Sequence, residues 1–66
     1  MKTFRFYKTA DARAIHNDFI TCVEIDACKI ETAIKRLYKH EKYEADAWCI
    51  TKVGEYEEKF VGCLSL

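Results

Sequence analysis

The segment from residue 26 to 42 most constrains the fold, because only this stretch has the apolar spacing of a helix. Its apolar residues recur three and four positions apart and line one face: Ala27, Ile30, Ala33, Ile34 and Leu37. Asp26 is a suitable N-cap, and basic residues near the end suit the negative pole of the helix dipole. The flanking segments are rich in β-branched and aromatic residues. We therefore expect one helix lying across one sheet.

Four segments beside this helix predict strands, at residues 3–8, 19–25, 43–53 and 56–64. Residues 9–18 are interpreted as a loop, with a helical turn capped by Thr9 as the alternative. The expected fold class is α+β, with a four-stranded antiparallel sheet, one helix on one face and the order β-β-α-β-β. Residues 1–66 form a single small domain on this interpretation. Connection lengths leave open a split arrangement or a simple meander.

Gly54 and Glu55 separate the last two strands and predict a two-residue type II′ turn, whose first position needs a positive φ. This turn pairs Val53 with Tyr56 and turns Ala47 and Cys49 toward the helix. The opposite face then carries an apolar set that one helix cannot cover: Tyr7, Ile20, Trp48, Ile50 and Val61, together with Cys22 and Cys63. Exposed apolar patches rimmed by polar residues usually mark contacts, so this set predicts a partner-binding surface.

The overall charge is balanced, with 11 basic and 11 acidic residues, so no global field attracts polyanions or anionic membranes. The helix end is nevertheless basic and supports an alternative, a small nucleic-acid-binding module. Its phosphate-binding residues would be Lys35, Arg36, Lys39 and Lys42, with sheet aromatics stacking on bases. The acidic C-terminal segment disfavours this alternative, which we place second.

No motif indicates catalysis. The four cysteines are spaced too widely and irregularly for a zinc site, and we expect four free thiols. His16 and His40 have no cysteine or serine arranged as a nucleophile and base, and two isolated glycines cannot form a phosphate-binding loop. We expect no enzyme, no cofactor and no metal. Cys22 and Cys63 would meet only if their strands are neighbours.

The chain shows neither the pattern of a signal peptide nor an apolar run that spans a membrane, so we expect a cytoplasmic protein without a membrane partner. A domain of 66 residues buries only about 60% of its unfolded surface. A homodimer would add core and cover the apolar face. The leading hypothesis is a small non-catalytic binding or regulatory protein acting through that face. Because short complete chains are common among phage and mobile-element genes, it includes a phage protein that blocks a host protein.

Overall fold

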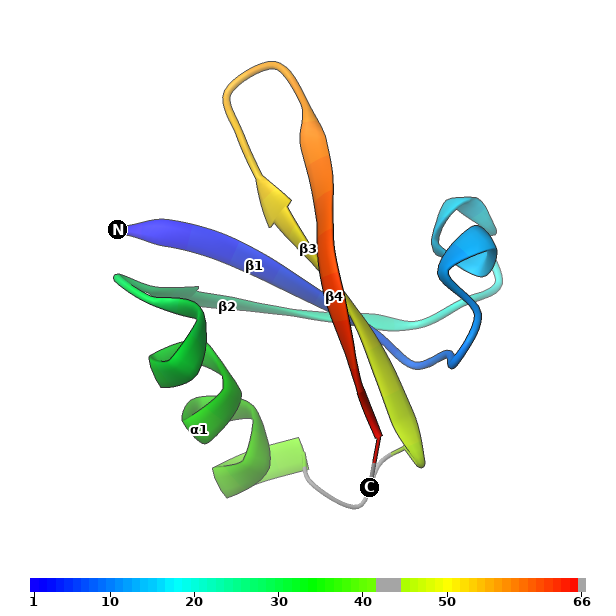
Figure 1. Ribbon diagram of the computed structural model, residues 1–66, viewed down its shortest axis with the longest axis horizontal. Coiled ribbons are helices and arrows are strands. Elements are labelled where there is room, and N and C mark those ends of the chain that lie inside the picture. The colour runs from blue at the N-terminus through cyan, green and yellow to red at the C-terminus, as the bar shows by residue number, and fades with distance from the viewer. Residues whose placement is uncertain (42–44, 66) are drawn as a thin grey trace.

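The computed structural model describes residues 1–41 and 45–65 of the chain. Its elements are β1 (Lys2–Tyr7), the 3-10 turn η1 (Ala12–His16), β2 (Cys22–Ala27), α1 (Ile30–Glu41), β3 (Ala47–Val53) and β4 (Glu58–Ser65). Within the described residues, four strands form one antiparallel sheet and α1 packs against it (Figure 1). The predicted α+β class and the order β-β-α-β-β are confirmed.

The strands lie in the order β2-β1-β3-β4, so β1 and β3 are central and β2 and β4 are the edges. Because β2 and β3 are each antiparallel to β1, they run parallel to one another on either side of it. Helix α1 therefore joins two parallel strands across an intervening strand. This is the split arrangement, one of the two that the connection lengths allowed.

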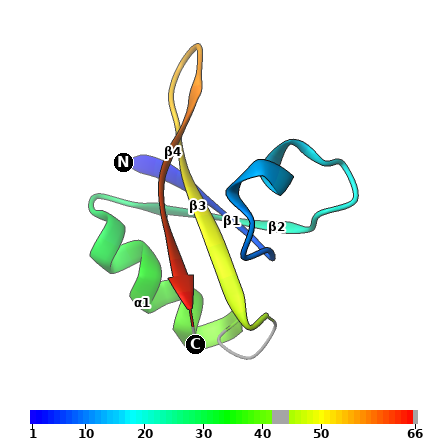
Figure 2. The same cartoon turned by 45° about the vertical axis from the view of Figure 1, so that its right-hand side comes forward.

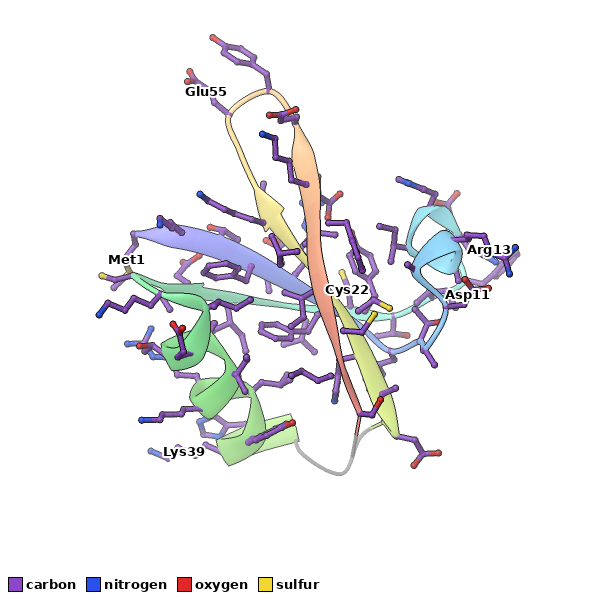
Figure 3. All side chains as sticks on the ribbon, viewed as in Figure 1. Met1, Asp11, Arg13, Cys22, Lys39 and Glu55 are labelled. Carbon is purple, nitrogen blue, oxygen red and sulfur yellow. The ribbon has the colours of Figure 1, made fainter. Side chains whose placement is uncertain are left out.

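Helix α1 and the turn η1 lie on opposite sides of the β3–β4 hairpin (Figures 1 and 2). The turn falls within residues 9–18, where the alternative of a helical turn is the one observed. Asp11 is its N-cap in place of Thr9, because the Asp11 carboxylate accepts from the Arg13 backbone N–H at 2.9 Å. The Arg13 guanidinium also donates to this carboxylate and lowers the pKa of Asp11. Figure 3 shows the two side chains together at this end of the molecule.

The hydrophobic core lies between α1 and the sheet. Ala33 and Leu37 on the predicted helical stripe are fully buried, and they pack with Phe4 and Phe6 of β1. The other buried members are Ala27, Trp48 and Ile50, and the half-buried residues packed against them are Val23, Ile25, Ile30, Ile34, Tyr38, Ala45 and Leu64. Each large apolar side chain buried here contributes about 1.5–3 kcal/mol. The alternation along the first two strands predicts Phe4, Phe6, Val23 and Ile25 on the face that the helix covers, and these four positions are confirmed.

Trp48 and Ile50 lie under α1, and their assignment to the uncovered face was wrong. Trp48 is 0% exposed and Ile50 is 2% exposed. Side chains alternate along a strand, so Cys49 and Thr51 face the other side. Trp48 and Ile50 face the helix because their side chains remove far more apolar surface from water than those of Ala47 and Cys49 would. The indole N–H of Trp48 has no hydrogen-bond partner among the described residues, so apolar area is what favours its burial.

The connection between β3 and β4 is a four-residue loop, 54–57, and the predicted two-residue turn was wrong. Val53 pairs with Glu58 instead of Tyr56, and the Gly54 N–H donates to the Glu57 C=O at 2.6 Å. Gly54 lacks the positive φ that a type II′ turn requires.

A β-bulge in β4 shifts the register further. Ile50 pairs with Gly62, whereas the next residue of β3 pairs two positions earlier in β4, which leaves Val61 without a partner across the ladder. Gly62 has a φ of 155°, a value that favours glycine. Because side chains alternate, one extra residue changes which side of β3 meets which side of β4. Gly62 therefore pairs with Ile50. The register of the two-residue turn predicts that it pairs with Ala47, which was wrong.

Helix α1 begins at Ile30, so the predicted start at Asp26 was also wrong. Asp26 belongs to β2 and pairs with Thr3, whose hydroxyl donates to its carboxylate at 2.6 Å. Cys28, expected in the first helical turn, lies exposed in the bend between β2 and α1. At the other end, Lys42 lies outside the described residues.

The variants Trp48→Ala and Val61→Thr separate the two assignments of these residues. Trp48→Ala should lower the free energy of unfolding by about 3–5 kcal/mol, because it empties a fully buried site. Val61 is 43% exposed, and Val61→Thr keeps the β-branch, so it should change that free energy by less than about 0.5 kcal/mol. Denaturant unfolding followed by circular dichroism measures both values. Equal stability of the two variants would contradict the observed placement of Trp48.

Candidate functional site

The five residues predicted to bind a partner do not form one surface. Trp48 and Ile50 are in the core beneath α1. Tyr7 is on the opposite face but only 7% exposed, and Ile20 is half-buried in the segment that follows η1. Val61 alone among them is substantially exposed, at the bulge of the edge strand β4. Within the described residues, these five side chains therefore do not form the predicted apolar docking face.

The face opposite α1 is instead organised in rows that cross all four strands. One row consists of Cys22, Tyr7, Cys49 and Cys63. The next consists of Glu24, Arg5, Thr51 and Phe60. Cys22 and Cys63 stand at opposite ends of their row, on the two edge strands, so they are not neighbours. The thiols that meet are Cys49 and Cys63, whose sulfur atoms lie 2.8 Å apart.

Glu58 is at the centre of a cluster of polar contacts on this face. The Tyr7 hydroxyl and the Thr51 hydroxyl each donate to its Oε1 at 2.5 Å. The Arg5 guanidinium lies 3.4 Å from Oε2 and also 3.4 Å from the Glu24 carboxylate. These groups come from all four strands, so the cluster ties β4 to β1 and β2 across the face.

The environment of Glu58 stabilises its charged form. Desolvation raises the pKa of Glu58, but hydrogen bonds from Thr51 and Tyr7 and the charge of Arg5 outweigh it, and the pKa lies below its ordinary value. Desolvation and the hydrogen bond to Glu58 raise the pKa of the Tyr7 hydroxyl. Every polar group of the cluster thus has a partner, which is the arrangement of a structural network.

A groove lies between β2 and the C-terminal half of α1. It has a volume of about 610 Å³ and is lined by Val23, Glu24, Ile25, Asp26, Arg36, Lys39 and His40. Half-buried Val23 and Ile25 supply its apolar part, and the three helix residues supply a basic wall. Figure 3 shows Lys39 projecting from α1 on the side away from the β3–β4 hairpin.

The backbone of β2 is open along this groove. The Lys8 N–H donates to the Thr21 C=O at 3.0 Å, in register with the β1–β2 ladder. Antiparallel pairs alternate between bonded and non-bonded, so the N–H and C=O groups of Glu24 and Asp26 point outward along the free edge. Arg36 donates to the outward C=O of Asp26. The edge groups of Glu24 lie between this contact and the start of the strand.

Only some of the basic residues predicted to bind nucleic acid line the groove. Arg36 and Lys39 line the groove, and His40 joins them there. Lys35 is exposed but does not line it, and Lys42 is outside the described residues. The positive charge is thus directed at a strand edge, a feature that the sequence could not place without the strand order.

Two further classes of site are absent from the described residues. Over those residues, no group of three or more histidine, cysteine or acidic side chains is placed to hold a metal ion. Nor does any helix in the described ranges combine the length and apolar character needed to cross a membrane.

Sequence reasoning missed both Glu58 and the groove. In the sequence Glu58 is one of several acidic residues of the C-terminal segment, and no local pattern distinguishes it. Its partners come from other strands, and its register depends on the loop and the bulge. The groove could be anticipated only in part, from the basic residues near the helix end.

Comparison of the chain with protein-family models, with curated proteins and with solved structures finds no match. Any functional inference therefore rests on the residues of this chain.

Glu58→Gln should make the free energy of unfolding depend less on pH in the acidic range. A carboxyl whose pKa is lowered on folding adds stability above its unfolded value of about 4.3, and this stability is lost as the pH falls through the folded pKa. The variant should be about 1–2 kcal/mol less stable than the wild type at neutral pH, and this difference should shrink as the pH falls through the lowered pKa of Glu58. Denaturant unfolding across this range measures it. Glu55→Gln at the loop tip is the control, and an equal loss there would contradict the role of Glu58 (Figure 3).

Proposed function

We propose that this chain is a small non-catalytic binding protein that takes an extended, acidic segment of a partner protein into the groove between β2 and α1. The observation that carries the proposal is the coincidence of an open strand edge with a basic helix wall. Recognition of this kind adds the partner segment to the sheet as a further strand. A regulatory protein of the cytosol that blocks such a segment in its partner fits this mode.

Backbone hydrogen bonds would supply the affinity. The outward N–H and C=O of Glu24 are an available donor and acceptor pair on the edge of β2. The neighbouring C=O of Asp26 already accepts from Arg36, so an added strand would centre on Glu24. The Glu24 side chain points to the other face, where its carboxylate is 3.4 Å from the Arg5 guanidinium, and it does not obstruct the helix side.

Side chains on the helix side would supply the specificity. An added strand directs alternate side chains toward α1, over Val23 and Ile25 and against Lys39 and His40. Carboxylates at those positions would meet the Lys39 ammonium group, whereas lysines would be repelled by it. Exposed charge pairs add little affinity each, so they mainly select the partner and speed association.

This proposal keeps the binding role expected from the sequence and moves its location. The apolar face that motivated a homodimer loses two of its large side chains, Trp48 and Ile50, to the core. A dimer in which β4 of a second copy enters the groove would lack the acidic alternation, because β4 carries Lys59 and Cys63 as well as Glu58. Light scattering of the free protein measures whether such a dimer forms.

Lys39→Gln and Lys35→Gln form a matched pair of tests, because both remove an exposed helix lysine and only Lys39 lines the groove. The probe is a capped peptide of alternating threonine and glutamate, titrated by calorimetry or by amide NMR shifts. Lys39→Gln should weaken binding several-fold and Lys35→Gln should leave it nearly unchanged. A matched threonine–lysine peptide should not bind.

The nucleic-acid alternative predicts the opposite pattern with the same variants. A single-stranded oligonucleotide would then bind better than the acidic peptide, with a steep dependence on salt. Lys35→Gln and Lys39→Gln would weaken it equally, and this outcome would replace the proposal.

Glu24→Pro tests strand addition itself. Proline removes the outward N–H of residue 24 and leaves the bonds between β1 and β2 intact, since the Glu24 N–H is not part of that ladder. Binding of the acidic peptide should fall by about tenfold or more, equivalent to about 1.4 kcal/mol. An unchanged circular dichroism spectrum shows that the variant is folded. Retained affinity in a folded Glu24→Pro variant would refute strand addition.

A further inference from the structure

We propose that Cys49 and Cys63 are an oxidation site, at which a low-molecular-weight disulfide such as oxidised glutathione converts two free thiols into a cross-strand disulfide between β3 and β4. The two residues pair directly across the ladder, and their sulfur atoms lie 2.8 Å apart. Both are free thiols in the structure. This site is remote from the groove between β2 and α1, so it stands or falls independently of the proposed function.

The ladder geometry suits such a bond. The Gly54 N–H bonds to Glu57 across the hairpin, so alternate residues of β3 counted back from Gly54 make the bonds to β4. Cys49 falls between them and occupies a non-hydrogen-bonded pair with Cys63. In such pairs the Cα atoms are about 4.5 Å apart and the side chains are closest, within the range that a disulfide spans.

The other two cysteines are excluded by position. Cys22 is in the same row but two strands away from Cys49, with Tyr7 between them. Strands are spaced about 4.8 Å apart, so this separation of roughly 10 Å exceeds the Cα distance of about 7 Å that a disulfide tolerates. Cys28 lies beyond the opposite end of β2. The structure therefore selects one pair among the four thiols.

Exposure sets the order of the two exchange steps. Cys63 is exposed, so its thiolate attacks the glutathione disulfide, forms a mixed disulfide and releases one glutathione thiol. Cys49 then attacks the Cys63 sulfur, which forms the internal disulfide and releases the second glutathione thiol. Two protein thiols are oxidised, one glutathione disulfide is reduced, and the two protons end on the two glutathione molecules.

The burial of Cys49 is consistent with this order. Desolvation, with the hydrogen bond to Cys63 and the charge of Asp11, raises the pKa of the Cys49 thiol to about 12. The thiolate is the attacking form, so Cys49 is a poor first nucleophile at neutral pH. It reacts because the mixed disulfide is held beside it, with Cys63 directly opposite on β4.

The test is incubation of the folded protein with graded ratios of oxidised to reduced glutathione, followed by acid quenching, alkylation and mass spectrometry. The wild type should lose two alkylatable thiols and the mass of two hydrogen atoms, and peptide mapping should join Cys49 to Cys63. Cys22→Ser, on the same face, should behave like the wild type. Cys63→Ser should never lose this mass and should only add glutathione.

A second readout is thermal unfolding. The bond joins residues 14 positions apart and restricts the unfolded chain, so the oxidised wild type should melt about 10 °C or more above the reduced form. Cys63→Ser should show no such shift. Four alkylatable thiols at every glutathione ratio, or a bond mapped to Cys22 or Cys28, would overturn the proposal.

Discussion

Burial of Trp48 and Ile50 beneath α1 is the interaction on which the other features depend, because neighbouring residues of a strand point to opposite faces. Once these two side chains face the helix, Cys49 and Thr51 must face away from it. Thr51 then donates to Glu58, and Cys49 meets the thiol opposite it on β4. A single choice of face on one central strand thus determines the core, the polar cluster and the thiol pair.

Periodicity was enough to predict the class of the fold. The helical stripe through Ala33 and Leu37 and the alternation of Phe4 and Phe6 are local patterns, and both are buried as expected. The face of β3 could not be predicted in this way, since either alternate set along that strand could serve as core. The register of the predicted turn placed Ala47 and Cys49 toward the helix, whereas the larger apolar area of the Trp48 indole favours the other face of β3 as the core. A ranking of the two faces by apolar area would have found Trp48.

The loop and the bulge show where local rules stop. Gly54 matches a two-residue turn, but four residues close the hairpin, and the extra residue Val61 has no sequence signal except the glycine that follows it. Register depends on both strands of a pair, so a wrongly predicted register makes every predicted contact between those strands wrong. The contacts of Glu58 with Tyr7 and Arg5 depend on that register and on the strand order, neither of which a single segment encodes. The basic wall of the groove was visible from the sequence, but the strand edge beside it was not.

The two edge strands differ in how well they could accept another strand. Edges of β-sheets are commonly protected by bulges and by charged side chains. The bulge at Val61 interrupts β4, and the φ of 155° at Gly62 bends its path, so an added strand there would have to follow an irregular edge. β2 pairs with β1 in unbroken register and has a regular outer edge, of which Arg36 occupies a single carbonyl among the contacts described. That contact also holds the basic side of α1 at the edge. On the proposed function, the same guanidinium would limit indiscriminate pairing along β2 and would favour a strand that brings carboxylates, so we expect a partner on β2 and not on β4.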